Sequence, residues 1–153
     1  MPRQVTVDAR FPTELPAVAV APSGLTQAVL NLVVNAGEAI AARPDPGHGR
    51  VQITATAGTD RSVVRLCVAD NGSGMTPETM LRAFEAFYTT KVHGKGTGLG
   101  LPMCRALLAK MGGTIRLESQ LDRWTRVIVS LPIVDAPAVQ DPDQAEPPKQ
   151  VSA

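Results

Sequence analysis

The chain has 153 residues, which suggests one domain of ordinary size. Its formal net charge of +1 gives no basic field for nucleic acid, and 3% aromatic residues disfavour a base-stacking surface. No apolar run reaches the roughly 18 residues of a membrane span. Two cysteines, Cys67 and Cys104, are too few for a disulfide framework or a four-ligand zinc site and favour a reducing cytoplasm.

The N-terminal third is predicted to hold two strands and a long helix. Residues 5–9 alternate between apolar and polar side chains as a short strand does, and residues 16–20 are expected to form another. Ser23 is expected to cap a long helix over residues 24–42. The Pro-Asp-Pro-Gly sequence at residues 44–47 ends that helix and forms a loop.

A strand pair and a short helix come next. Residues 51–57 and 63–69 are rich in β-branched side chains, and residues 58–61 are short enough to join them as a hairpin. Pro77 indicates the first turn of a short helix, because the missing N–H of proline costs little there.

The rest of the domain is predicted as a helix followed by two strands. A helix over residues 99–111 ends at the glycine pair 112–113. Residues 115–118 and 126–131 are expected to close the fold as strands.

The composition changes near the C-terminus. Residues 134–153 hold four prolines and four acids against one lysine. Few large apolar groups offset the entropy of ordering there, so a disordered tail is expected after a single domain over residues 1–133. Without the tail, whose net charge is −3, the chain's +1 becomes +4, which suits an anionic small ligand.

The long helix carries a polar stripe beside its apolar face. At 100° per residue, one side holds four polar residues: Gln27, Asn31, Asn35 and Glu38. Leu30 and Val34 flank the stripe, so its surroundings are expected to be partly buried, where amides need partners. The stripe is either a structural amide ladder or an ordinary polar face, or it is a wall in which Asn31 and Asn35 point at a polar ligand.

The strand over residues 63–69 runs into Asp-Asn-Gly-Ser-Gly at 70–74. Asp70 either caps a simple turn or accepts a hydrogen bond from an exocyclic amine at the strand end. In the second case Gly72 and Gly74 leave room for a flat ring, because glycine allows close approach to the backbone.

Alternating glycines precede the helix predicted over residues 99–111. They are Gly94, Gly96, Gly98 and Gly100. Exposed N–H groups beside a helix N-terminus suit a phosphate chain, although a mobile glycine loop is the alternative. A Walker A loop is excluded because no Ser or Thr directly follows Lys95, and the dinucleotide pattern G-x-G-x-x-G fails in every register.

In their order and spacing, these segments resemble the histidine kinase ATP-binding domain, whose superfamily includes gyrase, the Hsp90 chaperones and mismatch-repair ATPases. Residues 27–36 resemble its N box and residues 70–75 its G1 box. Residues 84–91 resemble its F box and residues 96–101 its G2 box. The resemblance covers residues 4–132, and the Thr-Thr-Lys end of the F box is most similar to the nitrogen-sensor type.

The resemblance implies the Bergerat fold, a two-layer α/β sandwich with a mixed β-sheet packed against about three α-helices. It also implies ATP and Mg²⁺ as cofactors. Asn35 is similar to the metal ligand, whose neutral amide suits a cation that takes its other ligands from phosphates and water. Asp70 matches the residue that recognises the adenine amino group. Residues 75–95 match the ATP lid, which Phe84 and Phe87 would anchor.

The implied catalytic residues are Asn31, Asn35 and Lys91, the last reaching the γ-phosphate. The implied nucleotide contacts are Asn35, Asp70, Gly72, Gly74, Gly96, Thr97, Gly98, Leu99, Gly100, Leu101 and Thr125. The superfamily's hydrolases carry a water-activating Glu where this chain has Asn31, which favours phosphoryl transfer over hydrolysis. Glu38 stands where many histidine kinases carry Lys, although the nitrogen-sensor type often has an acid. Trp124 replaces a usual Gly, either as a surface or edge anchor or by narrowing the site.

The implied function is that of the catalytic domain of a two-component sensor histidine kinase. It would bind Mg-ATP and pass the γ-phosphoryl group to a histidine on a separate dimerisation domain, for onward transfer to a response regulator. Neither His48 nor His93 lies in a long dimer-forming helix, so the substrate domain is absent here. A cytoplasmic monomer is expected, weakly active alone and without nucleic-acid or membrane contact. It is either excised from a longer sensor or a naturally standalone kinase. The alternatives are a standalone anti-sigma-type serine kinase and a non-catalytic nucleotide-sensing module.

Overall fold

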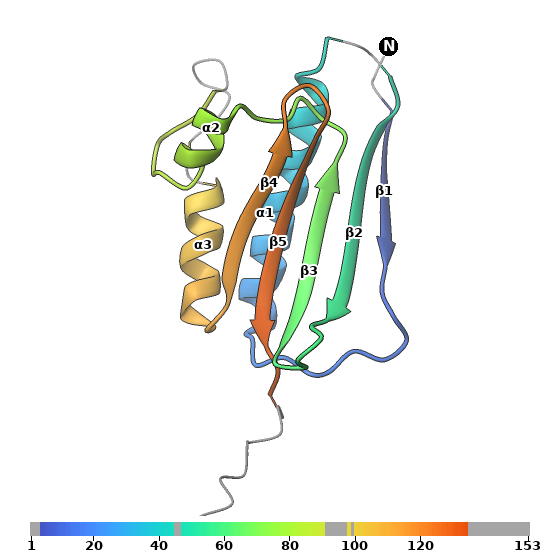
Figure 1. Ribbon diagram of the computed structural model, residues 1–153, viewed down its shortest axis with the longest axis vertical. Coiled ribbons are helices and arrows are strands. Elements are labelled where there is room, and N and C mark those ends of the chain that lie inside the picture. Colours follow the sequence, from blue (N-terminus) through green and yellow to red (C-terminus); the bar gives the residue numbers. More distant parts are fainter. Residues whose placement is uncertain (1–3, 45–46, 91–97, 99, 135–153) are drawn as a thin grey trace, which may run out of the picture.

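The computed structural model describes residues 4–44, 47–90, 98 and 100–134. Its strands are β1 (Val5–Arg10), β2 (Gly49–Ala57), β3 (Val63–Asp70), β4 (Thr114–Gln120) and β5 (Trp124–Pro132). They form one sheet in the order β1-β2-β3-β5-β4 (Figure 1). The β1–β2 pair is parallel and the other pairs are antiparallel, so the sheet is mixed.

Three helices complete the described part of the chain. They are α1 (Pro22–Ala41), α2 (Pro77–Arg82) and α3 (Gly100–Lys110). Helices α1 and α3 pack against each other and cover one face of the sheet, while the short α2 lies beside β4 (Figure 1). This two-layer arrangement confirms the predicted α/β sandwich. None of the helices among the described residues is long and apolar enough to cross a bilayer.

The predicted cap of α1 is wrong. The helix begins at Pro22, and its N-cap is Ala21, which makes no side-chain cap hydrogen bond. Proline suits the first helical position because its ring fixes φ and its missing N–H has no partner inside the helix. Ser23 therefore lies within the first turn.

The strand predicted over residues 16–20 is also wrong. Val18 makes one isolated antiparallel bridge with Ile133, and the chain then turns. The Val20 N–H donates to the Val18 carbonyl oxygen at 3.1 Å, which closes a three-residue turn and ends the pairing. By contrast, β2 and β3 pair as the predicted hairpin.

The core lies between the sheet and the two long helices. Alternate residues of the strands face α1 and α3, as the period of two requires. The buried side chains from the helices are Ala28, Leu32, Ala36, Ile40, Cys104 and Leu108. The core holds α1 and the start of α3 in fixed positions next to the ends of β3 and β5. The predicted tail, from residue 135 onward, lies outside the described residues.

Candidate functional site

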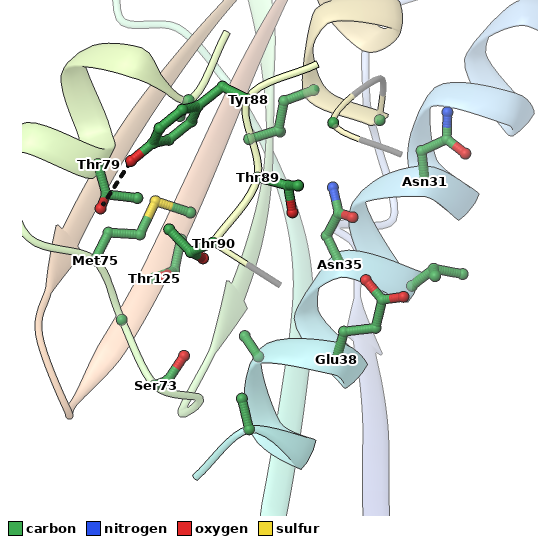
Figure 2. A pocket seen from close by; sticks show the side chains of 18 of the residues that line it. Asn31, Asn35, Glu38, Ser73, Met75, Thr79, Tyr88, Thr89, Thr90 and Thr125 are labelled. Carbon is green, nitrogen blue, oxygen red and sulfur yellow. Dashed lines mark hydrogen bonds between the residues drawn. The ribbon is translucent and has the colours of Figure 1, made fainter. Parts of the chain in front are cut away.

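A cavity of about 860 Å³ opens between α1, the beginning of α3 and the segments on either side of α2. Helix α1 contributes Asn31, Asn35 and Glu38 to its wall, as the polar stripe predicts. Figure 2 shows Thr89 and Thr90 across the cavity from Asn35 and Glu38. This volume is in the range of pockets that hold small-molecule and cofactor ligands.

Gln27, the remaining residue of the stripe, does not line the cavity, and the residues that flank the stripe are not partly buried as expected. Gln27 is exposed, its amide lies 3.8 Å from the Met103 sulfur, and it is not among the described residues that line the cavity. Leu30 and Val34 are 59% and 57% exposed, so the expected partial burial around the stripe is wrong. Both side chains are thus open to solvent, and Val34, unlike Leu30, also lines the cavity as far as the described residues define its wall.

A small recess of about 40 Å³ adjoins the large cavity and reaches toward the sheet. The two spaces share five lining residues: Asn35, Ala39, Met75, Leu101 and Thr125. Asp70 and Thr125 face each other as a register pair of β3 and β5 and give the recess its polar groups near the sheet. The remaining walls are apolar, from Leu32, Ala36, Val68 and Val127.

Asp70 is the buried acid of this recess, with 8% of its surface exposed. Burial raises its pKa to about 6, and a hydrogen bond from the Gly72 N–H, 2.8 Å from Oδ1, partly opposes that rise. The bond shows that Asp70 does cap the turn. A carboxyl group can accept several hydrogen bonds, so the cap leaves capacity for a ligand amine. Both predicted roles of Asp70 are therefore compatible.

The glycines after β3 hold the loop in place. A Cβ on Gly72 would lie 2.7 Å from the Ala39 Cβ, and the neighbouring Ser73 N–H donates to the Ala39 carbonyl at 2.9 Å. Gly72 lines neither cavity among the described residues, so its predicted nucleotide contact stays a prediction. Gly74 does line the large cavity. Its φ of +62° and its contact with the Gln120 carbonyl oxygen both require glycine.

The N-terminus of α3 faces the same cavity. A Cβ on Gly100 would lie 3.2 Å from Asn35 Nδ2, so the helix end comes close to α1 because this residue is small. Leu101 and Pro102 also line the cavity. The first N–H groups of a helix lack intrahelical partners and carry a partial positive charge, which favours an anion in front of them.

Gly98 is held by the segment that follows α2. Its φ is +67°, its carbonyl accepts the Phe87 N–H at 3.0 Å, and a Cβ on it would overlap the Phe87 backbone. Four predicted site residues lie outside the described part of the chain: Lys91, Gly96, Thr97 and Leu99. Their roles stay predictions.

The two phenylalanines of the predicted lid differ. Phe84 is half-buried, and the Arg105 guanidinium lies 5.6 Å from its ring centroid. Phe87 is 76% exposed and has a φ of +65°, so the expectation that it anchors the lid is wrong. Its backbone is fixed by Gly98, and this conformation leaves the ring in solvent.

Trp124 begins β5 and lies outside the lining of both cavities, as far as the described residues define it. The Arg126 guanidinium lies 5.4 Å from its ring centroid. This arrangement supports the edge-anchor alternative over a narrowed site.

The described residues include no group of three or more His, Cys, Asp or Glu that could hold a metal ion. Asn35 stands at the cavity wall beside the α3 N-terminus, and its amide oxygen is a suitable ligand for a hard cation. The donor set therefore fits a Mg²⁺ ion that arrives with phosphate and water ligands. It does not resemble an all-protein metal cage.

Part of the opposite wall consists of Ser73, Met75, Thr79, Tyr88, Thr89 and Thr90. All but Ser73 lie within the predicted lid at residues 75–95, but none of them was predicted individually as a nucleotide contact. Tyr88, Thr89 and Thr90 belong to the F box at residues 84–91, but no role follows from their residue types alone. The sequence offers one local signal for this wall, a pair of hydroxyl residues three apart at 76 and 79 that precedes a tyrosine.

The family model described as "Histidine kinase-, DNA gyrase B-, and HSP90-like ATPase" matches residues 20–135. The two-component sensor PprA of Pseudomonas aeruginosa is 37% identical over 134 residues, which are 88% of this chain and 14% of PprA. The sensory histidine kinase/phosphatase NtrB of Rhizobium leguminosarum is 34% identical over 135 residues, covering 80% of this chain and 34% of NtrB. The chain thus spans about a third or less of these curated relatives.

Two solved structures extend the likeness to three dimensions. Full-length ShkA in complex with AMPPNP matches with a TM-score of 0.72 and 30% identity, covering 86% of this chain and 26% of ShkA. The nucleotide-free catalytic domain of histidine kinase ThkA matches with a TM-score of 0.69 and 28% identity, covering 84% of this chain and 80% of the ThkA domain. The chain therefore belongs to the histidine kinase-, DNA gyrase B- and HSP90-like ATPase family and is a histidine kinase ATP-binding domain.

Proposed function

We propose that this domain binds Mg-ATP and transfers the γ-phosphoryl group to a histidine on a separate dimerisation domain, from which a response regulator receives it. The observation that carries the proposal is the pair of adjoining cavities, which share five lining residues and bring Asp70, Asn35 and the α3 N-terminus together. The buried carboxyl group of Asp70 suits the amino group of a base, and the N-terminus of α3 suits the phosphates. The catalytic domain is assigned to residues 1–133 and the tail to residues 134–153.

The nucleotide would be oriented by the two ends of this space. The base would lie in the large cavity at the mouth of the recess, which at about 40 Å³ is too small for a whole base. It would direct its amino group at the Asp70 carboxyl group, with Thr125 beside it. The α3 N-terminus and Asn35 would receive the phosphates. Asn35 would also hold Mg²⁺, which neutralises phosphate charge when bound. Phosphoryl transfer mainly requires such positioning and charge neutralisation from the protein.

Asn31 supports transfer rather than hydrolysis. It lines the cavity one helical turn before Asn35, where it can hydrogen-bond a phosphate or water. An amide has no basic group to take a proton from water, so this wall lacks a general base at that position. Lys91 is proposed to reach the γ-phosphate, as the family resemblance implies.

The acceptor is proposed to lie outside this chain. His48 is in the loop before β2, and its Nε2 lies 2.7 Å from the Thr6 hydroxyl oxygen rather than in the cavity wall. Cys67 and Cys104 are both free, which is in keeping with the proposed cytoplasmic location. The isolated domain is expected to be a monomer with weak activity.

The test supplies a histidine-bearing dimerisation domain from a related kinase and Mg-[γ-³²P]ATP. The expected product is an acid-labile phosphohistidine on the added domain, absent when the chain carries Asn35→Ala. Acid-stable phosphoserine would favour the anti-sigma-type alternative. ATP binding without transfer to any of several such domains would favour a nucleotide-sensing module.

A further inference from the structure

The chain after α2 is attached to that helix through Tyr88. The Thr79 hydroxyl oxygen accepts hydrogen bonds from the Thr76 hydroxyl at 3.0 Å and from the Tyr88 hydroxyl at 3.5 Å. The Arg82 guanidinium lies 4.2 Å from the centroid of the Tyr88 ring, and the Tyr88 N–H donates to the Glu85 carbonyl at 3.3 Å. Tyr88 is therefore fixed by its ring, its hydroxyl and its backbone.

The same stretch is tied to the approach to α3. Phe87 donates its N–H to the carbonyl of Gly98, two residues before α3 begins. Thr89 and Thr90 follow Phe87 by two and three residues, so an extended chain keeps them within about 10 Å of that contact. Both line the large cavity, and Figure 2 shows them across from Asn35.

The position of the two threonines indicates which part of a nucleotide they meet. Neither lines the recess that contains Asp70, toward which the amino group of the base is proposed to point. They are instead connected to the α3 N-terminus, where anions are favoured. Threonine hydroxyls can donate to phosphate oxygens, and such bonds to charged groups are stronger than neutral ones.

We infer that the Thr89 and Thr90 hydroxyls donate hydrogen bonds to the terminal phosphates of ATP, and that Tyr88 is a positioning residue that holds them at the cavity wall. The inference deepens the proposed function and rests on it. On this inference, Thr89 and Thr90, two neutral side chains on the side of the cavity opposite Asn35, contribute to the preference for ATP over AMP.

The first experiment measures ATP, ADP and AMP dissociation constants by calorimetry on the 153-residue chain with Mg²⁺. The Thr89→Val/Thr90→Val variant removes both hydroxyls and keeps the branched shape. ATP binding is expected to weaken at least about tenfold, as for the loss of one hydrogen bond to a charged group, while AMP binding changes less than about twofold. Thr56→Val is the matched control, because Thr56 is exposed on β2 with its pairing partner Arg65.

An equal loss for ATP and AMP would overturn the phosphate assignment, and so would unchanged ATP binding. The Thr89→Ser/Thr90→Ser variant keeps the hydroxyls and is expected to retain ATP binding close to wild type. Failure of the wild-type chain to bind ATP would reject both the inference and the proposed function. ATP binding that needs Asn35 but ignores both threonines would reject the inference alone.

The positioning role is tested by Tyr88→Phe, which keeps the ring on Arg82 and removes the hydroxyl. ATP binding is expected to weaken about threefold, with no further weakening when the change is added to Thr89→Val/Thr90→Val. Such non-additivity is the signature of residues that act through each other. An additive loss, or an equal loss for AMP, would show a purely structural effect and overturn the role of Tyr88.

Discussion

The buried carboxyl group of Asp70 should reduce the stability of the nucleotide-free protein at neutral pH. Burial raises its pKa from the ordinary value of 3.8 to about 6. Since one pKa unit corresponds to about 1.4 kcal/mol, ionisation of this group costs the folded state about 3 kcal/mol. The cost is consistent with its exposed fraction of 8%.

The sign of the pH dependence follows from the raised pKa. Between about pH 4 and pH 6 the folded state binds more protons at Asp70 than the unfolded state does. The contribution of Asp70 to stability therefore falls as the pH rises through this window. Above pH 6 the full cost is present, and below about pH 4 it is absent.

The perturbation is Asp70→Asn, which removes the charge and keeps an oxygen that can accept the Gly72 N–H. We expect the variant to be more stable than the wild type by up to about 3 kcal/mol at pH 7.5, a gain that vanishes near pH 4. It should at the same time lose most of its ATP affinity, because an amide presents the adenine amino group with a different pattern of donors and acceptors.

The assay is urea unfolding followed by circular dichroism at pH 4, 5, 6 and 7.5 without nucleotide. Glu78→Gln is the control, since Glu78 is an exposed acid in the first turn of α2 and should change stability by less than about 1 kcal/mol. A variant that is less stable than wild type at pH 7.5, or a difference that does not depend on pH, would refute the reasoning.

Three further predictions concern the frame of the site. Gly74→Ala is expected to destabilise the fold by at least about 1–2 kcal/mol and to weaken ATP binding, because a Cβ meets the Gln120 carbonyl at φ +62°; urea unfolding and calorimetry measure the two effects. Leu108→Ala should lower the free energy of unfolding by about 2–5 kcal/mol, whereas Leu81→Ala, at an 85% exposed position, should change it by less than about 0.5 kcal/mol; equal effects in urea unfolding would contradict the described core. Trp124→Phe should leave the ATP dissociation constant within about twofold, and a larger change in calorimetry would show that this residue does reach the nucleotide.

The sequence predicts well those features that repeat along the chain. Period-two alternation identified β1, and β-branched composition identified β2 and β3. The helical period brought Asn31, Asn35 and Glu38 onto one wall of the cavity. These patterns are local consequences of backbone geometry. Gly98 and Gly100 were also recognisable in the sequence as part of a glycine-rich segment. In the structure Gly98 packs against Phe87 and Gly100 against Asn35, and both contacts require a small residue.

Features that depend on distant contacts were harder to predict. Residues 16–20 carry strand-forming side chains, yet only Val18 meets Ile133 before the chain turns. Phe87 was expected to anchor the lid, but its contact with Gly98 holds it in a left-handed conformation with the ring exposed. In both cases a tertiary partner, absent from the local pattern, decides the outcome.

The exposure of Leu30 could not be predicted from the sequence for the same reason. A helical wheel gives the direction of each side chain but not which neighbouring element will cover it, and no described element covers this side of α1. The contribution of Thr89 and Thr90 to the cavity wall likewise depends on how Tyr88 is attached to α2.

Calorimetric titration of the 153-residue chain with ATP, with and without Mg²⁺, tests the central claim most directly. One-to-one binding that is stronger with Mg²⁺ is predicted, and Asn35→Ala and Asp70→Asn should each weaken it at least about tenfold while Thr56→Val does not. No binding by the wild-type chain, or binding that neither substitution affects, would contradict the assignment of this cavity to Mg-ATP.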